Sequence, residues 1–137
     1  MCLDKLENFE VTQDYGWQVF SKNYTGSYIY SRFHRNDEPV PVGKWQRDKF
    51  RMLNRWIYID KNVEYKKGFH IFLNEDDARI YCPSNEKYCL KKVKFQRVVA
   101  KGFQVIVGGG QKRWAKVVVC HKRFVEPDQE EKDGKRT

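Results

Sequence analysis

The alternation of apolar and polar residues along the chain predicts a mostly β protein, with short turns between its strands. Runs with the length and composition of strands occur in the first half of the chain at 17–20, 28–33, 56–59 and 68–73. Residues 23–26 predict a turn between the first two runs, and residues 36–43, which include two prolines, predict a loop. Residues 44–54 are ambiguous, because their apolar positions have helical spacing over too short a stretch to decide.

A short helix is predicted directly after the run 68–73. Asn74 is a suitable N-cap, and residues 75–77 place three acids in the first turn, where they interact favourably with the helix dipole. Residues 78–81 continue the helix, and Pro83 ends it.

The C-terminal half predicts three further strands, at 90–100, 103–107 and 113–125. Lys101-Gly102 and the glycines 108–110 are the predicted turns, so these strands form an antiparallel meander. The polar residues 126–137 have no periodicity and predict a disordered tail. The sequence therefore predicts an α+β, mostly β fold with an antiparallel sheet and one or two short helices, in a single globular domain over residues 1–125.

Length and composition exclude several classes of protein. A length of 137 residues suits one domain with a core of its own, and 40% hydrophobic residues exclude a disordered chain. The longest aliphatic run is 117–119, which is too short to span a bilayer, and residues 1–10 lack the apolar region of a secretory signal. We therefore expect a cytoplasmic protein with no membrane partner.

The net charge of +9 is concentrated in one segment. Residues 1–86 contain 13 basic and 13 acidic side chains, residues 87–125 contain 11 basic side chains and no acid, and residues 126–137 contain three basic and five acidic ones. A merely solubilising surface is one explanation, but such surfaces usually mix both signs. An acid-free segment carries a repulsive cost that an anionic partner would offset, so we expect a nucleic acid, a nucleotide or an acidic protein.

Residue alternation in the strand 90–100 separates an apolar face from a basic one, because the central odd positions are apolar and the central even positions include Lys92 and Lys94. In the last strand, Trp114 and Lys116 share a face. If these strands are neighbours, the three lysines lie on one exposed sheet face with Trp114 beside them. Such a face can hold a base and a phosphate together. The expectation depends on the register between the strands, which alternation does not fix.

The candidate phosphate-binding residues come from the acid-free segment and are Lys91, Lys92, Lys94, Arg97, Gly109, Gly110, Lys112, Arg113, Lys116, Lys122 and Arg123. Trp114 and Phe103 are the candidates for stacking on a base. Successive N–H groups of the glycine-rich turn 108–110 can form an anion-binding concavity, with added charge from the two cations that follow it. The turn is neither a P-loop nor a dinucleotide fingerprint, and a flexible hairpin loop is the simpler alternative.

No catalytic or metal-binding pattern stands out. The four cysteines have long spacings without a C-x-x-C pair, and the adjacent Cys120 and His121 project to opposite faces of a strand. His70 is a candidate acid–base group, with Tyr81 or Lys116 as a helper, and a partly buried, hydrogen-bonded histidine is the structural alternative. We therefore expect no metal, no cofactor and no enzymatic activity.

Three short motifs resemble a layout found in small uncharacterised bacteriophage and prophage proteins. They are residues 16–20 (GWQVF), 68–72 (GFHIF) and 76–78 (DDA), followed by a valine-rich basic strand. Small basic phage proteins include counter-defence factors, some of which bind nucleic acid or sequester nucleotide signals. The resemblance therefore implies such a role in the cytoplasm of a host cell, but it includes no motif from which ligand residues transfer.

These observations lead to three hypotheses. The first is a non-enzymatic binding protein for a phosphate-bearing ligand, either nucleic acid or a nucleotide signal. The second is an anti-CRISPR-like inhibitor that docks on an acidic or nucleic-acid-binding protein of a host defence complex. The third is a small nuclease or nucleotide-processing enzyme with His70 or His121 as the acid–base group. A homodimer is compatible with each, since 21 aromatic residues are many for one small core.

Overall fold

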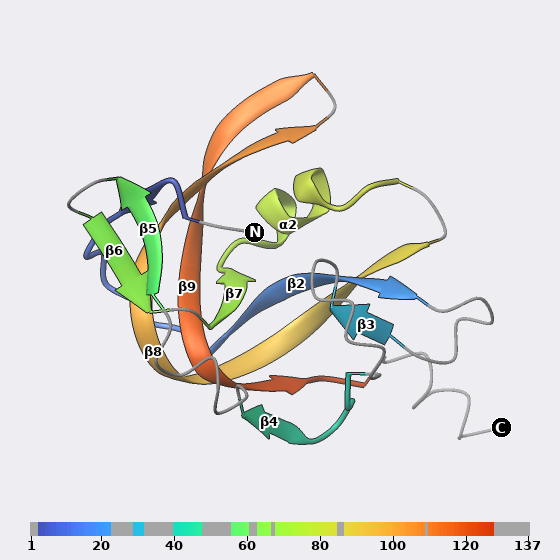
Figure 1. Cartoon of the computed structure of the whole chain (residues 1–137). Coiled ribbons are helices and arrows are strands. Elements are labelled where there is room, and N and C mark those ends of the chain that lie inside the picture. The colour runs from blue at the N-terminus through green and yellow to red at the C-terminus, as the bar shows by residue number, and fades with distance from the viewer. Residues whose placement is uncertain are drawn as a thin grey trace, which may run out of the picture.

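Two long antiparallel strands, β8 (Tyr88–Gly108) and β9 (Gln111–Val125), form the frame of the structure, a computed structural model (Figure 1). The structure describes residues 3–22, 29–31, 40–47, 56–60, 63–66, 68–84, 87–108 and 110–127. The other elements are β1 (Lys5–Leu6), β2 (Tyr15–Lys22), β3 (Ile29–Ser31), β4 (Trp45–Arg47), β5 (Trp56–Asp60), β6 (Val63–Lys66), β7 (Phe69–Phe72) and α2 (Glu75–Tyr81). The predicted fold class, mostly β with an antiparallel sheet, is confirmed.

Four strands pair with one another in a closed ring. The start of β8 pairs with β2, β2 pairs with β7, β7 pairs with β9, and β9 pairs along its length with β8. β1 and β4 add to the outer edges of β8 and β9, β3 pairs with β2, and β5 and β6 form a separate hairpin. The result is a small barrel, from which residues 103–108 and 111–116 of the β8–β9 hairpin project as an arm (Figure 1).

The turn predicted at Lys101-Gly102 is wrong, because both residues lie inside the continuous strand β8. Gly102 pairs with Leu6 of β1, and a Cβ atom at Gly102 would collide with the backbone carbonyl oxygen of Lys5. The glycine therefore allows a close approach of β1 rather than a change of chain direction. The predicted three-stranded meander is consequently a hairpin of two long strands, and its turn lies at Gly110, where φ is +77°.

A β-bulge bends β8 where the barrel meets the arm. Arg97 has φ +59°, in the left-handed region that residues other than glycine rarely adopt. The register between β8 and β9 then shifts by one residue between Val98 and Ala100. Because of this shift, the buried positions of β8 change from odd to even numbers, so that Ile106 is buried in the arm.

Two hydrophobic clusters hold the sheet together. One fills the barrel and includes Phe20, Ile71 and Phe95, and the other lies outside the barrel wall beneath α2 and includes Ala78 and Ile106. The apolar run of β9 separates the two clusters, with Val118 and Cys120 on the barrel side and Val117 and Val119 on the side of α2. This burial on both faces explains why the run is uninterrupted by polar residues.

The predicted helix is confirmed as α2. The side chain of Asn74 accepts a hydrogen bond of 2.9 Å from the backbone N–H of Asp76, and Pro83 follows the C-cap. The sequence explained Asp77 only by its favourable position in the first turn of the helix, but Asp77 also contacts the arm. Its Oδ1 lies 2.7 Å from Nη2 of Arg113 in the arm, and the two side chains form an ion pair.

The remaining sequence predictions are confirmed in part. Strands occupy the runs predicted around β2, β3, β5 and β7, and the ambiguous segment contains the short strand β4. Several predictions lie outside the described residues, namely the turn 23–26, residues 36–39 of the loop, residues 48–54 and the tail beyond 127. Among the helices that the structure describes, none has the length and apolar character needed to cross a membrane.

Candidate ligand-binding surface

One row of side chains crosses four neighbouring strands on the outside of the barrel. Tyr15 of β2 lies opposite Lys94 of β8, Lys94 lies opposite Phe124 of β9, and Phe124 lies opposite Trp45 of β4. Directly opposed residues of antiparallel strands project to the same face of a sheet. We call these four residues the outer row, which presents an aromatic ring, a cation and two further aromatic rings in spatial order.

The outer row points away from the core because the residues beside it point inwards. Val93 and Phe95, which flank Lys94 in β8, are buried in the barrel. Val125, which follows Phe124 in β9, is buried in the same cluster. Alternation along the strands then directs Lys94 and Phe124 outwards. Trp45 at the end of the row is 44% exposed.

The lysines of this surface are held by aromatic rings. The Nζ atom of Lys92 lies 4.5 Å from the ring centroid of Tyr15, and the Nζ atom of Lys94 lies 5.8 Å from that of Phe124. The rings of Trp45 and Phe124 are 5.6 Å apart and tilted by 54°. A cation–π contact orients an ammonium group without neutralising its charge. Both lysines can therefore still attract an anion.

Further cations surround the outer row. Lys122 of β9 lies opposite Gln96 of β8 and Arg47 of β4, which gives a second row parallel to the first. We call the combined surface the basic–aromatic face, made of the outer row together with Lys92, Gln96, Lys122 and Arg47.

Two acids lie near the basic–aromatic face. Oε1 of Glu126 lies 3.9 Å from Nζ of Lys94, and the backbone N–H of Glu126 donates to the carbonyl of Lys92. The exposed Asp14 precedes Tyr15 in the chain. An exposed ion pair at 3.9 Å contributes little, so the face keeps a positive charge from its four cations.

The helix α2 leaves this face uncovered. It packs over the opposite end of the same outer surface, where Trp17 of β2 and Leu90 of β8 lie against the cluster that contains Ala78. Tyr15 and Lys94 lie further along the same strands, towards β4. Among the described elements, α2 thus covers the half of the outer surface that carries Trp17 and Leu90, and not the half that carries Tyr15 and Lys94.

Lys116 and Trp114 do not join Lys92 and Lys94 on one face, contrary to the sequence expectation. Lys116 shares a face of β9 with Val118 and Cys120, which point into the barrel, whereas Lys94 points out of it. The strong bend and the bulge in β8 change which face is exposed along the hairpin. Two fully buried positions of β9, Val118 and Cys120, therefore separate Lys116 and Trp114 from Lys92 and Lys94.

Arg123 is the predicted phosphate ligand that the structure places in the interior. It is 2% exposed, and its guanidinium donates hydrogen bonds to the side-chain oxygens of Gln46 at 2.8 Å and Gln18 at 3.0 Å. Its Cζ atom lies 4.0 Å from the ring centroid of Phe69. We therefore leave Arg123 out of the surface, where its role is to join β2, β4 and β9.

The other predicted residues are spread along the hairpin. Lys91 is half-buried, Arg97 is exposed at the bend, and Arg113 is engaged with Asp77 of α2. Phe103 and Lys112 lie in the arm with Trp114 and Lys116. Gly109 lies outside the described residues, and Gly110 forms the hairpin turn, so the anion-binding concavity stays a prediction.

His70 is buried in a hydrogen-bonded network, as the structural alternative predicts. It is 7% exposed, its Nε2 lies 3.0 Å from the hydroxyl of Tyr65, and its Nδ1 lies 3.1 Å from the carbonyl of Gly68. The Tyr65 hydroxyl also accepts a hydrogen bond of 2.8 Å from the backbone N–H of Leu3. His34 lies outside the described residues. Among those described, no group of three or more His, Cys, Asp or Glu side chains is placed to hold a metal ion.

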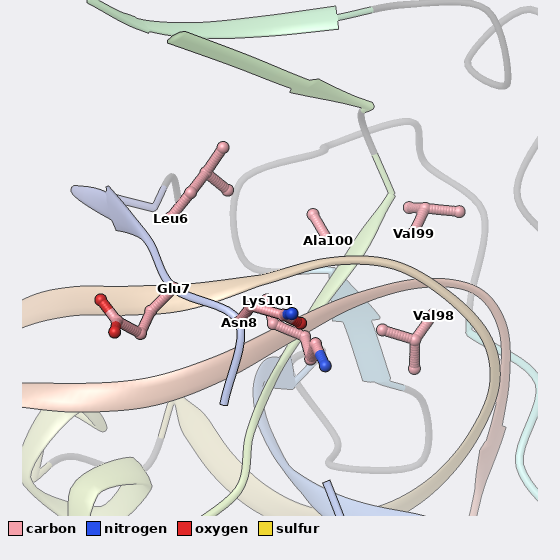
Figure 2. Close-up of a pocket in the computed structure, with 7 residues that line it drawn as sticks. All are labelled: Leu6, Glu7, Asn8, Val98, Val99, Ala100 and Lys101. Atoms are coloured by element: carbon pink, nitrogen blue, oxygen red, sulfur yellow. The ribbon is translucent and has the colours of Figure 1, made fainter. Parts of the chain in front are cut away.

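A small pocket lies between the N-terminal segment and the bulge of β8 (Figure 2). It is lined by residues 6–8 at the end of β1 and by residues 98–101 at the bulge of β8. The Lys101 ammonium donates a 2.8 Å hydrogen bond to the carbonyl of Phe9, so the only cation in the lining is already bound. The Glu7 carboxylate is likewise paired with Lys5, and we assign no site to the pocket.

Comparison with known protein families, with curated proteins and with solved structures finds no match to this chain. The basic–aromatic face is therefore the feature of the molecule that indicates its function. Tyr15 and Trp45 were missed as candidates from the sequence, because each became part of the face only through pairing with a distant strand. The aromatic character of both residues was visible, but no local signal indicates their positions beside Lys94 and Phe124.

Proposed function

We propose that the protein binds single-stranded nucleic acid on the basic–aromatic face and catalyses no reaction on it. The observation that carries this proposal is the outer row, in which Lys94 lies between Tyr15 on one side and Phe124 and Trp45 on the other. Aromatic rings accept bases by stacking, and lysines neutralise the phosphates that join them.

The spacing of the row suits a polynucleotide. Neighbouring strands of a sheet are about 4.8 Å apart, so Tyr15 and Phe124, which are two strands apart, are separated by about 10 Å. Lys94 occupies the position between them, where a phosphate linking two stacked nucleotides would lie. Lys92 and Lys122 add positive charge on either side of the row.

An open strand suits this surface better than a duplex or a compact nucleotide. In a duplex the faces of the bases are stacked on one another, so they are not available to protein rings. A small nucleotide usually binds in a concave pocket that buries most of its surface. None of the residues that line the pocket at 6–8 and 98–101 belongs to this face. Under this proposal, the counter-defence role implied by the phage resemblance would consist of covering or sequestering a nucleic acid.

Fluorescence anisotropy with labelled oligonucleotides tests the proposal. At about 50 mM salt the protein should bind a single strand of about 12 nucleotides more tightly than the matching duplex, with affinity falling as salt rises. Trp45→Ala should weaken binding roughly 5- to 150-fold, because one stacked base contributes about 1–3 kcal/mol. Trp45→Phe, which keeps a ring, should recover most of the loss.

A polyanion without bases provides the control. Binding of inorganic polyphosphate should be the same for the wild-type protein and Trp45→Ala, because it depends on charge alone. Absence of oligonucleotide binding at about 50 mM salt would refute the proposal. Equal weakening of oligonucleotide and polyphosphate binding in Trp45→Ala would show that Trp45 acts on the fold and not by stacking.

A further inference from the structure

A second row of cations and an aromatic ring crosses the base of the arm. Lys5 of β1 lies opposite Phe103 of β8, and Phe103 lies opposite Lys116 of β9. The next positions of the same face pair Val105 with Trp114 and Val107 with Lys112. We call this surface the arm face, made of Lys5, Phe103, Val105, Val107, Lys112, Trp114 and Lys116.

The aromatic residues of the arm face are held in place by one another. The ring of Phe103 meets Phe9 edge-on with centroids 5.6 Å apart, and it meets Trp114 at 90° with centroids 6.3 Å apart. Nζ of Lys116 lies 5.3 Å from the ring centroid of Phe9. Trp114 is nevertheless 55% exposed, so it presents a large oriented ring to a ligand.

The charge of the arm face is positive. Its β8 and β9 positions include two lysines and no acid. Among the described residues, neither Lys112 nor Lys116 forms an ion pair. Lys5 is paired with Glu7 at 3.4 Å, and the carboxylate of Asp4 is engaged by the backbone N–H of Val105. The exposed ring and the lysines beside it therefore fit an anion that also carries an aromatic group.

The arm face and the basic–aromatic face are separated along β9 by Val118 and Cys120, which are fully buried. Lys116 is on the side of β9 that carries Val118 and Cys120 into the barrel, and Lys94 projects from the outside of the barrel. A strand that lies flat on one face cannot continue directly onto the other. Both faces can be occupied together only by two strands or by two separate segments of one strand.

We propose that the arm face is a second binding site for single-stranded nucleic acid, so that one chain bridges two strands. This inference rests on the proposed function, because it assigns to the arm face the chemistry argued for the basic–aromatic face. Trp114 stacks on a base, Phe103 supports its ring, and Lys112 and Lys116 neutralise phosphates. An acidic peptide is the other ligand of suitable charge, and the experiment below distinguishes it.

The stoichiometry of binding tests the bridging. Native mass spectrometry with oligonucleotides of about six nucleotides should show two bound per wild-type chain. The double variant Trp114→Ala/Lys116→Gln and the double variant Trp45→Ala/Lys94→Gln should each bind one. These variants form a matched pair, because each removes one exposed tryptophan and one lysine charge. Thermal melting of each variant within a few degrees of wild type shows that the fold is retained.

A capture assay measures bridging itself. Beads carrying one oligonucleotide should retain a second, labelled oligonucleotide only when wild-type protein is present. Each double variant should reduce this retention at least about 10-fold, the loss expected when a stacked base and a phosphate contact are removed. The single variant Trp114→Ala should also lose retention. Trp114→Phe, which keeps a ring in the arm, should restore most of this loss.

The outcomes separate the two proposals. One oligonucleotide per wild-type chain, lost only in Trp45→Ala/Lys94→Gln, would overturn the second site and leave the proposed function intact. One per chain, lost only in Trp114→Ala/Lys116→Gln, would overturn both the bridging and the assignment to the basic–aromatic face. No binding to either variant or to wild type would overturn both proposals. An arm face that binds a polyglutamate peptide and no oligonucleotide would assign that face to acidic proteins and overturn the inference.

Discussion

Lys94 of β8 lies directly opposite Phe124 of β9 on the outside of the barrel, and its Nζ atom is 5.8 Å from the centroid of that ring. The pair places a positive charge beside an aromatic surface. Glu126 does not fully neutralise this charge, because its Oε1 approaches Nζ of Lys94 only to 3.9 Å. Tyr15 and Trp45 extend the same row in both directions. This relationship leads directly to predictions about charge and stacking.

Lys94→Gln should reduce the slope of log affinity against log salt by about 0.7 for a single strand, because one phosphate fewer is neutralised. The measurement is the oligonucleotide affinity at a series of salt concentrations. Arg79→Gln is the matched control, because it removes the same charge from α2, where Arg79 pairs with Glu75. An equal change of slope in both variants would mean that binding depends on net charge and not on the outer row.

Gly102→Ala should lower the free energy of unfolding by about 1–3 kcal/mol, the usual cost of overpacking. The added Cβ would meet the Lys5 carbonyl, so β1 has to move away from β8. Urea unfolding measures the effect. Gly110→Asn is the comparison. A Cβ atom added at Gly110 would have no atom within 4 Å, and asparagine tolerates the left-handed backbone conformation at this position, where φ is +77°. A Gly102→Ala variant as stable as wild type would contradict the pairing of β1 with β8.

Tyr65→Phe should destabilise the protein by about 1–3 kcal/mol, because the backbone N–H of Leu3 and Nε2 of His70 each lose the hydrogen bond to the Tyr65 hydroxyl in a buried site. Tyr15→Phe removes a hydroxyl group from the outer surface and should leave the free energy of unfolding unchanged. Chemical denaturation of the two variants provides the comparison. Equal stability of Tyr65→Phe and wild type would show that the network around His70 contributes nothing to folding.

The buried carboxyl of Asp77 should make stability depend on pH. Burial raises the pKa of Asp77 above its ordinary value of 3.8, and the nearby Arg113 opposes this shift. The folded state then binds the proton of Asp77 more tightly than the unfolded state does. Asp77 therefore stabilises the fold most at a pH below the pKa that it has in the unfolded state. This contribution is lost as the pH rises through the pKa that it has in the folded state. The stability of wild type relative to Asp77→Asn should therefore fall between about pH 3 and pH 7.

Urea unfolding of both proteins across this range measures the difference. Asp14→Asn, which removes an exposed carboxyl just before β2, is the control. If the stability of wild type relative to Asp77→Asn rises with pH, then the ion pair with Arg113 outweighs the burial of the carboxyl.

Some of the structure follows from local patterns in the sequence. The helix α2 was predictable because its signals, the Asn74 cap and the acids behind it, act within one turn. The outward direction of Lys92 and Lys94 was also predictable, because alternation along one strand decides it. These features depend on neighbours in the chain and on no distant contact.

Other features depend on pairing between distant segments. Trp45 belongs to the outer row only because β4 pairs with β9, and a segment of three residues has no pattern that indicates such a register. The burial of Arg123 depends on Gln18 and Gln46 from two other strands. The separation of Lys116 from Lys94 depends on the bend and bulge of β8 near Arg97, which a regular alternation does not reveal.

Photocrosslinking tests the central claim most directly, because it identifies the residues that touch the bases. An oligonucleotide with 5-iodouridine at several positions is bound to the wild-type protein at low salt, irradiated, and mapped by mass spectrometry of peptides. We expect crosslinks at Tyr15, Trp45 or Phe124 of the outer row and, if the arm face also binds, at Trp114. A bound oligonucleotide that crosslinks to none of Tyr15, Trp45 and Phe124 would contradict the account.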